Sequence, residues 1–232
     1  MSDQTIYKKP VGLSRENHKL LKLKPMENLE FTTGINSVPI TGIEFFEASR
    51  DLPILFRRSD TGALFPLALL SLSNEGHFQL DDSGRWTGNY VPAFIRRYPF
   101  ALTAEGQVCF DEDSGLFSEE EGEPLFTEDG KNSDMLEKAI TFLRRNKEES
   151  DRTRDFCDAL SKLDLVEPFD IQLVKQGSKP LRLEGLLVIS EKKLAKALDE
   201  GSCFDWFRKG WLAWTYAHLH SLGALRRLKR EA

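Results

Sequence analysis

Residues 85–100 read RWTGNYVPAFIRRYPF, and no other part of the chain is as dense in aromatic and arginine side chains. Five aromatic rings surround the adjacent guanidinium groups of Arg96 and Arg97. The rings bring large apolar area to bury, whereas two permanently charged guanidinium groups require a carboxylate, a phosphate, an aromatic face or water. This stretch is therefore the main candidate for a binding site. Its candidate ligand-binding residues are Trp86, Tyr90, Arg96, Arg97 and Tyr98.

The local conformation of this stretch is predicted to be a single helical turn over residues 91–98. Pro92 suits the first helical position and Pro99 ends the turn, because proline lacks a backbone N–H. Adjacent residues on a turn point in different directions. We therefore expect carboxylates of residues 111–123 to hold one guanidinium and the other to face a cleft lined by aromatic rings of the stretch.

The composition predicts a folded globule. The chain has 232 residues and is 40% hydrophobic, with 32 Lys and Arg against 37 Asp and Glu and a net charge of −5. A core can form at this length, and a net negative chain has no general positive field to attract nucleic acid or anionic lipid. No apolar run approaches the roughly 20 residues of a membrane span. Nucleic acid and a membrane span are therefore not expected.

The first residues and the cysteines predict a cytoplasmic location. The opening MSDQTIYKKPVGLSRENHK lacks the apolar centre and cleavage site of a secretory signal. Cys109, Cys157 and Cys203 are widely spaced and odd in number, which favours reduced, mostly buried thiols over a disulfide framework.

The order of elements predicts an α+β protein. Residues 1–30 show little periodicity and are interpreted as a loosely ordered arm, ahead of a single domain at 31–232. Within it, 38–110 carries short strand patterns separated by Gly and Asp turns, including a hairpin around 57–62 and a strand at 77–80. Such spacing is typical of an antiparallel meander or half-open barrel.

An acidic loop is predicted over 111–133. Its spacing fails the calcium-loop motif, because Gly115 and Leu116 occupy loop positions 5 and 6 when counted from Asp111. We favour a solvated loop pinned by its apolar residues over a divalent-ion site, with carboxylate partners for Arg96 and Arg97 as a third option.

A long helix is predicted over 134–163, opened by a cap at Ser133–Asp134. Apolar residues recur at helical spacing from Leu136 to Leu143 and again from Phe156 to Leu163. The charged middle, residues 146–154, interrupts this pattern. We expect it to stand clear of the core or to meet another molecule, which makes self-association through the 134–163 helix a hypothesis.

The remainder, 134–232, continues with a hairpin and a helical end. Residues 169–189 alternate around a turn at 176–178 and form the most secure strand pair. Ser190 and Ser202 are predicted to open short helices. The last helix, 211–228, presents an apolar stripe through Leu212, Tyr216 and Leu219. His218 on an adjoining stripe is a further ligand-binding candidate, although a satisfied structural histidine is favoured.

Several blocks resemble the bacterial SapC family over about residues 18–228. They are PILFRRSDTGALFPLALLSL, GRWTGNYVPAFIRRYPF, CFDEDSGLFSEEEGEPLF, LEGLLVISEKKL and YAHLHSLGALRRL. The peptide-transporter permease of the same name is a different, membrane protein. The resemblance implies a link to a surface layer, or an accessory role in nutrient uptake or peptide modification, and supplies no catalytic residues.

The function predicted is a non-enzymatic cytoplasmic binding or accessory protein for a peptide or small anionic partner. The sequence lacks phosphate-loop, dinucleotide, catalytic-triad and zinc spacings, so no cofactor, metal or catalytic residue is assigned. The alternatives are an enzyme that uses an aromatic and arginine cleft, and a surface-layer component that self-associates.

Overall fold

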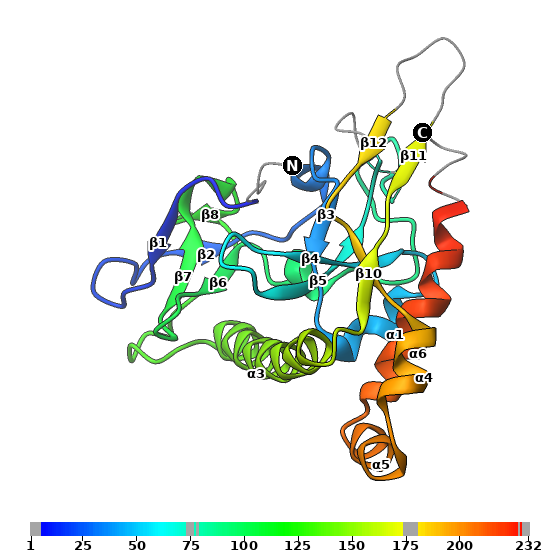
Figure 1. The fold of residues 1–232 in the computed structure, drawn as a ribbon. Coiled ribbons are helices and arrows are strands. Elements are labelled where there is room, and N and C mark those ends of the chain that lie inside the picture. Colours follow the sequence, from blue (N-terminus) through cyan, green and yellow to red (C-terminus); the bar gives the residue numbers. More distant parts are fainter. Residues whose placement is uncertain (1–5, 73–76, 78, 174–180, 227, 229–232) are drawn as a thin grey trace.

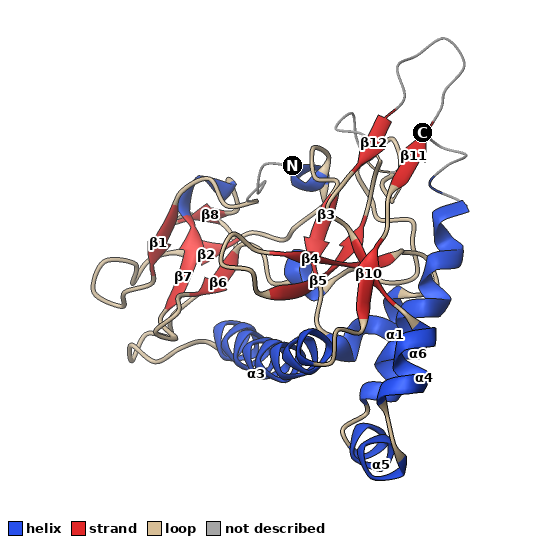
Figure 2. Cartoon of the chain, in the orientation of Figure 1, coloured by secondary structure: helices blue, strands red, loops and turns tan. Residues whose placement is uncertain are grey.

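The protein is α+β, as predicted, with antiparallel sheets, a long helix and a helical C-terminal region (Figures 1 and 2). The structure is a computed structural model and describes residues 6–72, 77, 79–173, 181–226 and 228. The largest sheet has the strand order β10-β13-β4-β5-β3. Its strands are β3 (Ser37–Pro39), β4 (Ile54–Arg58), β5 (Leu64–Leu69), β10 (Val166–Pro168) and β13 (Leu187–Ile189).

The β4–β5 hairpin forms around the predicted turn and divides the core into two layers. Consecutive side chains of a strand point to opposite faces. Ile54 and Phe56 accordingly pack into the larger core, whereas Leu55 packs on the other face with Leu225 and Leu228. Both faces of this sheet are therefore buried, which explains the near-continuous apolar pattern of its strands.

Two smaller sheets lie beside the large one, so residues 38–110 do not form a single meander or half-open barrel. The two strands on either side of residues 104–106 join a strand of the N-terminal segment in the order β1-β7-β6, and a third sheet has the order β8-β2-β9. These strands are β1 (Pro10–Gly12), β2 (Lys22–Leu23), β6 (Phe100–Leu102), β7 (Val108–Asp111), β8 (Phe117–Ser118) and β9 (Glu123–Pro124).

The strand predicted at residues 77–80 is wrong. His77 and Gln79 are not in a strand, and Leu80 forms only an isolated bridge with Trp86; residue 78 lies outside the described residues. The backbone here forms a tight turn instead of a ladder: the N–H of Thr87 donates to the carbonyl of Gln79, and the N–H of Asp81 donates to the carbonyl of Arg85.

The long helix is confirmed as α3 (Asp134–Lys162), and the Ser133 side chain accepts a hydrogen bond from the Leu136 N–H. Its first half packs with β6 and β7 in a small core, and its second half packs in the main core. The prediction that its middle stands clear of the core is wrong at Thr153, which is only 4% exposed, whereas the other residues of 146–154 are exposed or half-buried. Self-association through this helix stays a prediction.

The strand pair predicted over 169–189 is present as β11 (Ile171–Leu173) and β12 (Leu181–Leu183), and its turn at 176–178 lies outside the described residues. The returning strand is shorter than predicted, because residues 187–189 form β13 in the large sheet. The C-terminal helices are α4 (Glu191–Ala197), α5 (Glu200–Arg208) and α6 (Trp211–Ser221). The shorter helical segments are η1 (Glu30–Thr32), η2 (Gly42–Glu44), α1 (Phe45–Ala48), α2 (Ala93–Arg96), η3 (Glu112–Ser114) and η4 (Leu222–Ala224).

Two details of the helical region differ from the prediction. Asp199, not Ser202, caps α5 and accepts a hydrogen bond from the Ser202 N–H. The buried face of α6 carries Trp214 and His218, whereas Tyr216 is 53% exposed. The stripe that carries Trp214 and His218 packs inward, and the His218 ring bonds to backbone groups of β4 and β13. Among the described residues, no helix is both long and apolar enough to cross a membrane.

Candidate functional site

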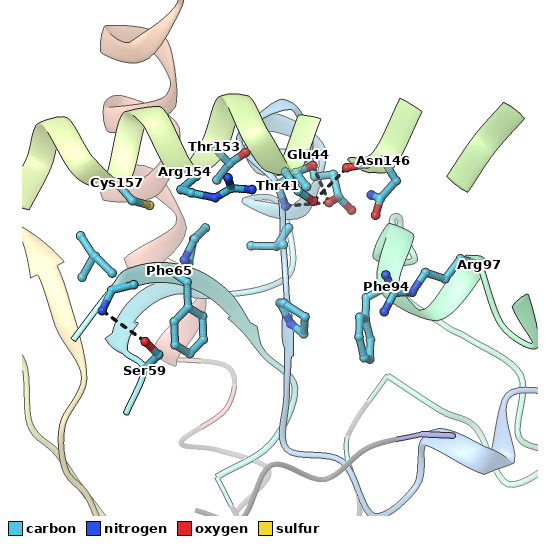
Figure 3. A pocket seen from close by; sticks show the side chains of 16 residues that line it. Thr41, Glu44, Ser59, Phe65, Phe94, Arg97, Asn146, Thr153, Arg154 and Cys157 are labelled. Atoms are coloured by element: carbon cyan, nitrogen blue, oxygen red, sulfur yellow. Dashed lines mark hydrogen bonds between the residues drawn. The ribbon is translucent and has the colours of Figure 1, made fainter. Parts of the chain in front are cut away.

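A pocket of about 400 Å³ lies between α3 and the large sheet (Figure 3). Side chains of α3 line one side of it, and the ends of β3, β4 and β5 line the other. The short helix α2 closes one end, where Figure 3 shows Phe94 and Arg97 together. The volume falls in the range of about 300–1,000 Å³ that is usual for small-molecule sites.

The α3 wall carries small polar side chains at helical spacing. Asn146, Ser150, Thr153 and Cys157 follow one another at intervals of four, three and four residues, which places them on one face. The Thr153 hydroxyl donates to the helix carbonyl of Glu149 at 2.6 Å and accepts from the N–H of Gly42 at 2.8 Å. This face therefore fixes α3 to η2 while leaving open space beside it.

A buried carboxylate organises the floor between β3 and α2. Glu44 is 5% exposed, and its Oε2 accepts hydrogen bonds from the N–H and the hydroxyl of Thr41, both at 2.8 Å. Its Oε1 accepts from the Tyr90 hydroxyl at 2.8 Å and from the N–H of Ala93 at 2.7 Å. Four donors satisfy this charge without a cation, so Glu44 anchors α2.

Arg97 presents the least satisfied charge of the pocket. Its guanidinium carbon lies 4.4 Å from the centre of the Phe94 ring and 5.8 Å from that of Tyr7. Its Nε is buried and has no hydrogen-bond partner, and within the described part of the chain no carboxylate pairs with the guanidinium. Aromatic faces fix the plane of the group, but its charge lacks an anion.

The other charged and reactive groups of the lining are already engaged or inert. Arg154 forms an ion pair with Asp151 one turn earlier in α3. Burial raises the pKa of the Cys157 thiol to about 12, so it stays protonated at neutral pH and is a poor nucleophile. The lining contains no histidine.

Arg96 does not line the pocket. Its Nε donates to the carbonyl of Val91 at 2.9 Å and its terminal nitrogen to the Tyr90 hydroxyl at 3.0 Å, while its guanidinium lies over the rings of Tyr90 and Phe142. Burial, then the charge of Glu44, raises the pKa of Tyr90. The Glu44–Tyr90–Arg96 chain holds α2 in place.

The acidic loop does not supply an ion-pair partner to either guanidinium. Its first residue, Asp111, is fully buried and accepts instead from the Tyr98 hydroxyl at 2.9 Å and from the N–H groups of Lys8 and Lys9. Burial, then this bond, raises the pKa of Tyr98. Tyr98 and Phe31 stack at 4.2 Å and line a separate hollow of about 740 Å³.

The two remaining predicted residues lie elsewhere. Trp86 lies beside His77, with ring centres 5.6 Å apart, and its indole Nε1 has no hydrogen-bond partner. His218 is fully buried; its Nε2 accepts from the N–H of Ile189 at 3.1 Å, so its Nδ1 carries the proton that is donated to the carbonyl of Ile54 at 2.9 Å. Burial lowers its pKa to about 4. His218 joins β13, β4 and α6 and has no free nitrogen for a ligand.

The structure thus brings Tyr90, Arg96 and Arg97 together around α2, and of the six predicted residues only Arg97 lines the pocket. The sequence reasoning missed the α3 wall and Glu44. The α3 wall could have been found from the stripe of small uncharged side chains that continues the helical phase of the apolar residues at both ends of the helix. Within the described residues, no cluster of three His, Cys, Asp or Glu side chains is arranged to hold a metal ion.

The fold and site define the class as an α+β protein with a pocket roofed by a helix. The chain belongs to the SapC family, which it matches over residues 13–228. That match covers nearly the whole sequence and confirms the resemblance seen in its blocks. Neither the curated proteins nor the solved structures include a significant match to this sequence.

Proposed function

We propose that this protein is a non-enzymatic, cytoplasmic binding protein that holds a small anionic ligand, or the anionic end of a peptide, between α3 and the large sheet. The observation that carries the proposal is the guanidinium of Arg97, which lines the pocket without a carboxylate partner. A partly buried cation without an anion is costly, and a bound anion removes that cost. Such a protein fits the accessory role that the family resemblance implies.

Binding is favoured over catalysis by the state of the other lining groups. The thiol of Cys157 is held protonated, and the carboxylate of Glu44 already accepts four hydrogen bonds. Neither is available as a nucleophile or a general base without breaking contacts that support the fold.

A thermal-shift screen tests the proposal, using short peptides and small carboxylates and phosphates against the purified protein. At least one compound at saturating concentration should raise the melting temperature by about 2 °C or more. Ser150→Leu supplies the blocked control, because Ser150 is exposed on α3, lines the pocket and bonds only to its own helix. Leucine suits a helix and fills the opening.

The control is Glu148→Leu, which also places a leucine at an exposed position of α3, outside the lining. Stabilisation should disappear in Ser150→Leu and persist in Glu148→Leu. A screen without any stabilising compound, or one in which both variants respond like the parent, would contradict the proposal.

A further inference from the structure

We infer that the ligand is a monocarboxylate with an apolar body, and this inference rests on the proposed function. Three features of the lining carry it: the balance of charge, the fixed plane of one guanidinium, and the apolar wall opposite α3.

The balance of charge favours a single negative charge on the ligand. Of the two arginines that line the pocket, Arg154 is matched by Asp151, and Arg97 is not. The lining also contains the carboxylate of Glu44, which is close enough to share the same cavity. A phosphate monoester, with up to two negative charges, would therefore face one free cation and one fixed anion. A carboxylate brings one charge and matches Arg97 alone.

The geometry of Arg97 suits a planar anion. The rings of Phe94 and Tyr7 lie near the guanidinium and hold its plane, so that hydrogen bonds are made at its edges. The parallel N–H groups of a guanidinium match the two oxygens of a carboxylate. Since the group is already oriented, little side-chain freedom remains to be lost on binding.

The wall opposite α3 suits an apolar body. It consists mainly of Ile40, Leu64, Phe65 and Pro66, which come from the loop after β3 and from β5. Figure 3 shows Phe65 along the strand side of the pocket and Phe94 with Arg97 at the α2 end. A ligand whose carboxylate lies at α2 therefore extends its remaining atoms along an apolar surface. The amide of Asn146, on the α3 side, can bond to one further polar group.

Calorimetric titration of the parent protein with three matched compounds tests this inference: 3-phenylpropionate, its neutral amide 3-phenylpropionamide, and 2-phenylethyl phosphate. The carboxylate should bind about tenfold or more tightly than the amide, because a charge-assisted pair is lost. The phosphate should also bind more weakly than the carboxylate. Equal binding of amide and carboxylate, or tighter binding of the phosphate, overturns the inference and leaves the proposed function standing.

Variants then assign the carboxylate to its partner. Arg97→Gln should weaken binding of 3-phenylpropionate about tenfold or more, whereas Arg96→Gln, one residue earlier and outside the lining, should change it less than about twofold. Comparable losses in both variants overturn the assignment to Arg97. The comparison of compounds uses the parent alone, so the inference can be overturned even if Arg97→Gln does not fold. If none of the three compounds binds while other anions stabilise the protein in a Ser150-dependent way, the inference fails and the proposed function holds.

Discussion

The hydroxyl of Tyr98 donates a 2.9 Å hydrogen bond to the buried carboxylate of Asp111. The same carboxylate accepts from the N–H groups of Lys8 and Lys9, so it ties the start of the chain to the end of β7. Asp111 is one of the acids of residues 111–123 that were expected to hold a guanidinium, and it serves the neighbouring tyrosine instead. The Tyr98–Asp111 bond is consequently a structural feature next to the site and not a part of it.

Breaking this bond should destabilise the fold without touching the pocket. Tyr98→Phe and Asp111→Asn should each lower the free energy of unfolding by about 1–3 kcal/mol, because each leaves buried polar groups poorly paired. In a double-mutant cycle the two losses should not add. Chemical denaturation measures all three variants. Glu112→Gln is the control, since its ion pair with Lys9 lies on the surface and should contribute less than about 1 kcal/mol. Additive losses would show that the bond does not couple the two residues.

The middle of α3 should be sensitive at one position only. Thr153→Val keeps the volume but removes the acceptor for the buried N–H of Gly42, and should cost about 1–3 kcal/mol in the free energy of unfolding. Glu148→Ala, on the exposed side of the same segment, should cost less than about 0.5 kcal/mol. Equal and small losses in denaturant unfolding would mean that this part of the helix does not pack on η2.

The sequence was sufficient to predict α3, because apolar residues repeat at both ends with the same phase. It was misleading about the middle. The side chains that line the pocket there are those of Asn146, Ser150 and Thr153. On hydropathy alone they look like part of a charged and solvated segment. Small polar residues occupy these positions because the helix passes over a pocket and over the N–H of Gly42, and such a partner cannot be seen from local sequence.

Acid should destabilise the protein through His218. Its pKa in the fold is about 4, below the ordinary 6.5, so the unfolded chain takes up a proton between these values and the folded protein does not. The free energy of unfolding should therefore fall as the pH drops from about 6.5 to about 4, by up to roughly 1.4 kcal/mol per pH unit for this group. His77, whose pKa burial also lowers to about 4, adds in the same direction.

Denaturant unfolding at several pH values measures this slope. His218→Gln should be less stable than the parent at pH 7 and should show a shallower slope between pH 6.5 and 4. His220→Gln, at an exposed position two residues away, should retain the slope of the parent. An imidazole of His218 that titrates near pH 6.5 in the folded protein by NMR would contradict the account.

The site was predictable in part, for reasons of chemistry. Arg97 stood out because a guanidinium among aromatic rings needs an anion, and it does line the pocket. His218 was equally prominent in the sequence, but both of its nitrogens bond to backbone groups of strands far away in the chain. The strands β1 and β2 were not foreseen, since two or three residues show no period and take their conformation from their partners in β7, β8 and β9.

The three thiols should react at very different rates. Cys203 is exposed, whereas Cys109 and Cys157 are buried and burial raises the pKa of each. A chromogenic disulfide reagent at pH 8 should therefore modify one thiol quickly in the native protein and all three after denaturation. Cys203→Ser should abolish the fast phase. Two fast thiols in the native protein would show that one of the buried positions opens to solvent.

The binding account is tested most directly by the NMR signals of the arginine Nε–H groups during titration with 3-phenylpropionate. Arg97 Nε has no partner, whereas Arg96 Nε is already bonded to the carbonyl of Val91 and serves as the internal reference. The Arg97 signal should shift in proportion to the bound fraction while the Arg96 signal stays in place. Saturable binding with an unmoved Arg97 signal, or with a shift confined to Arg96, would contradict it.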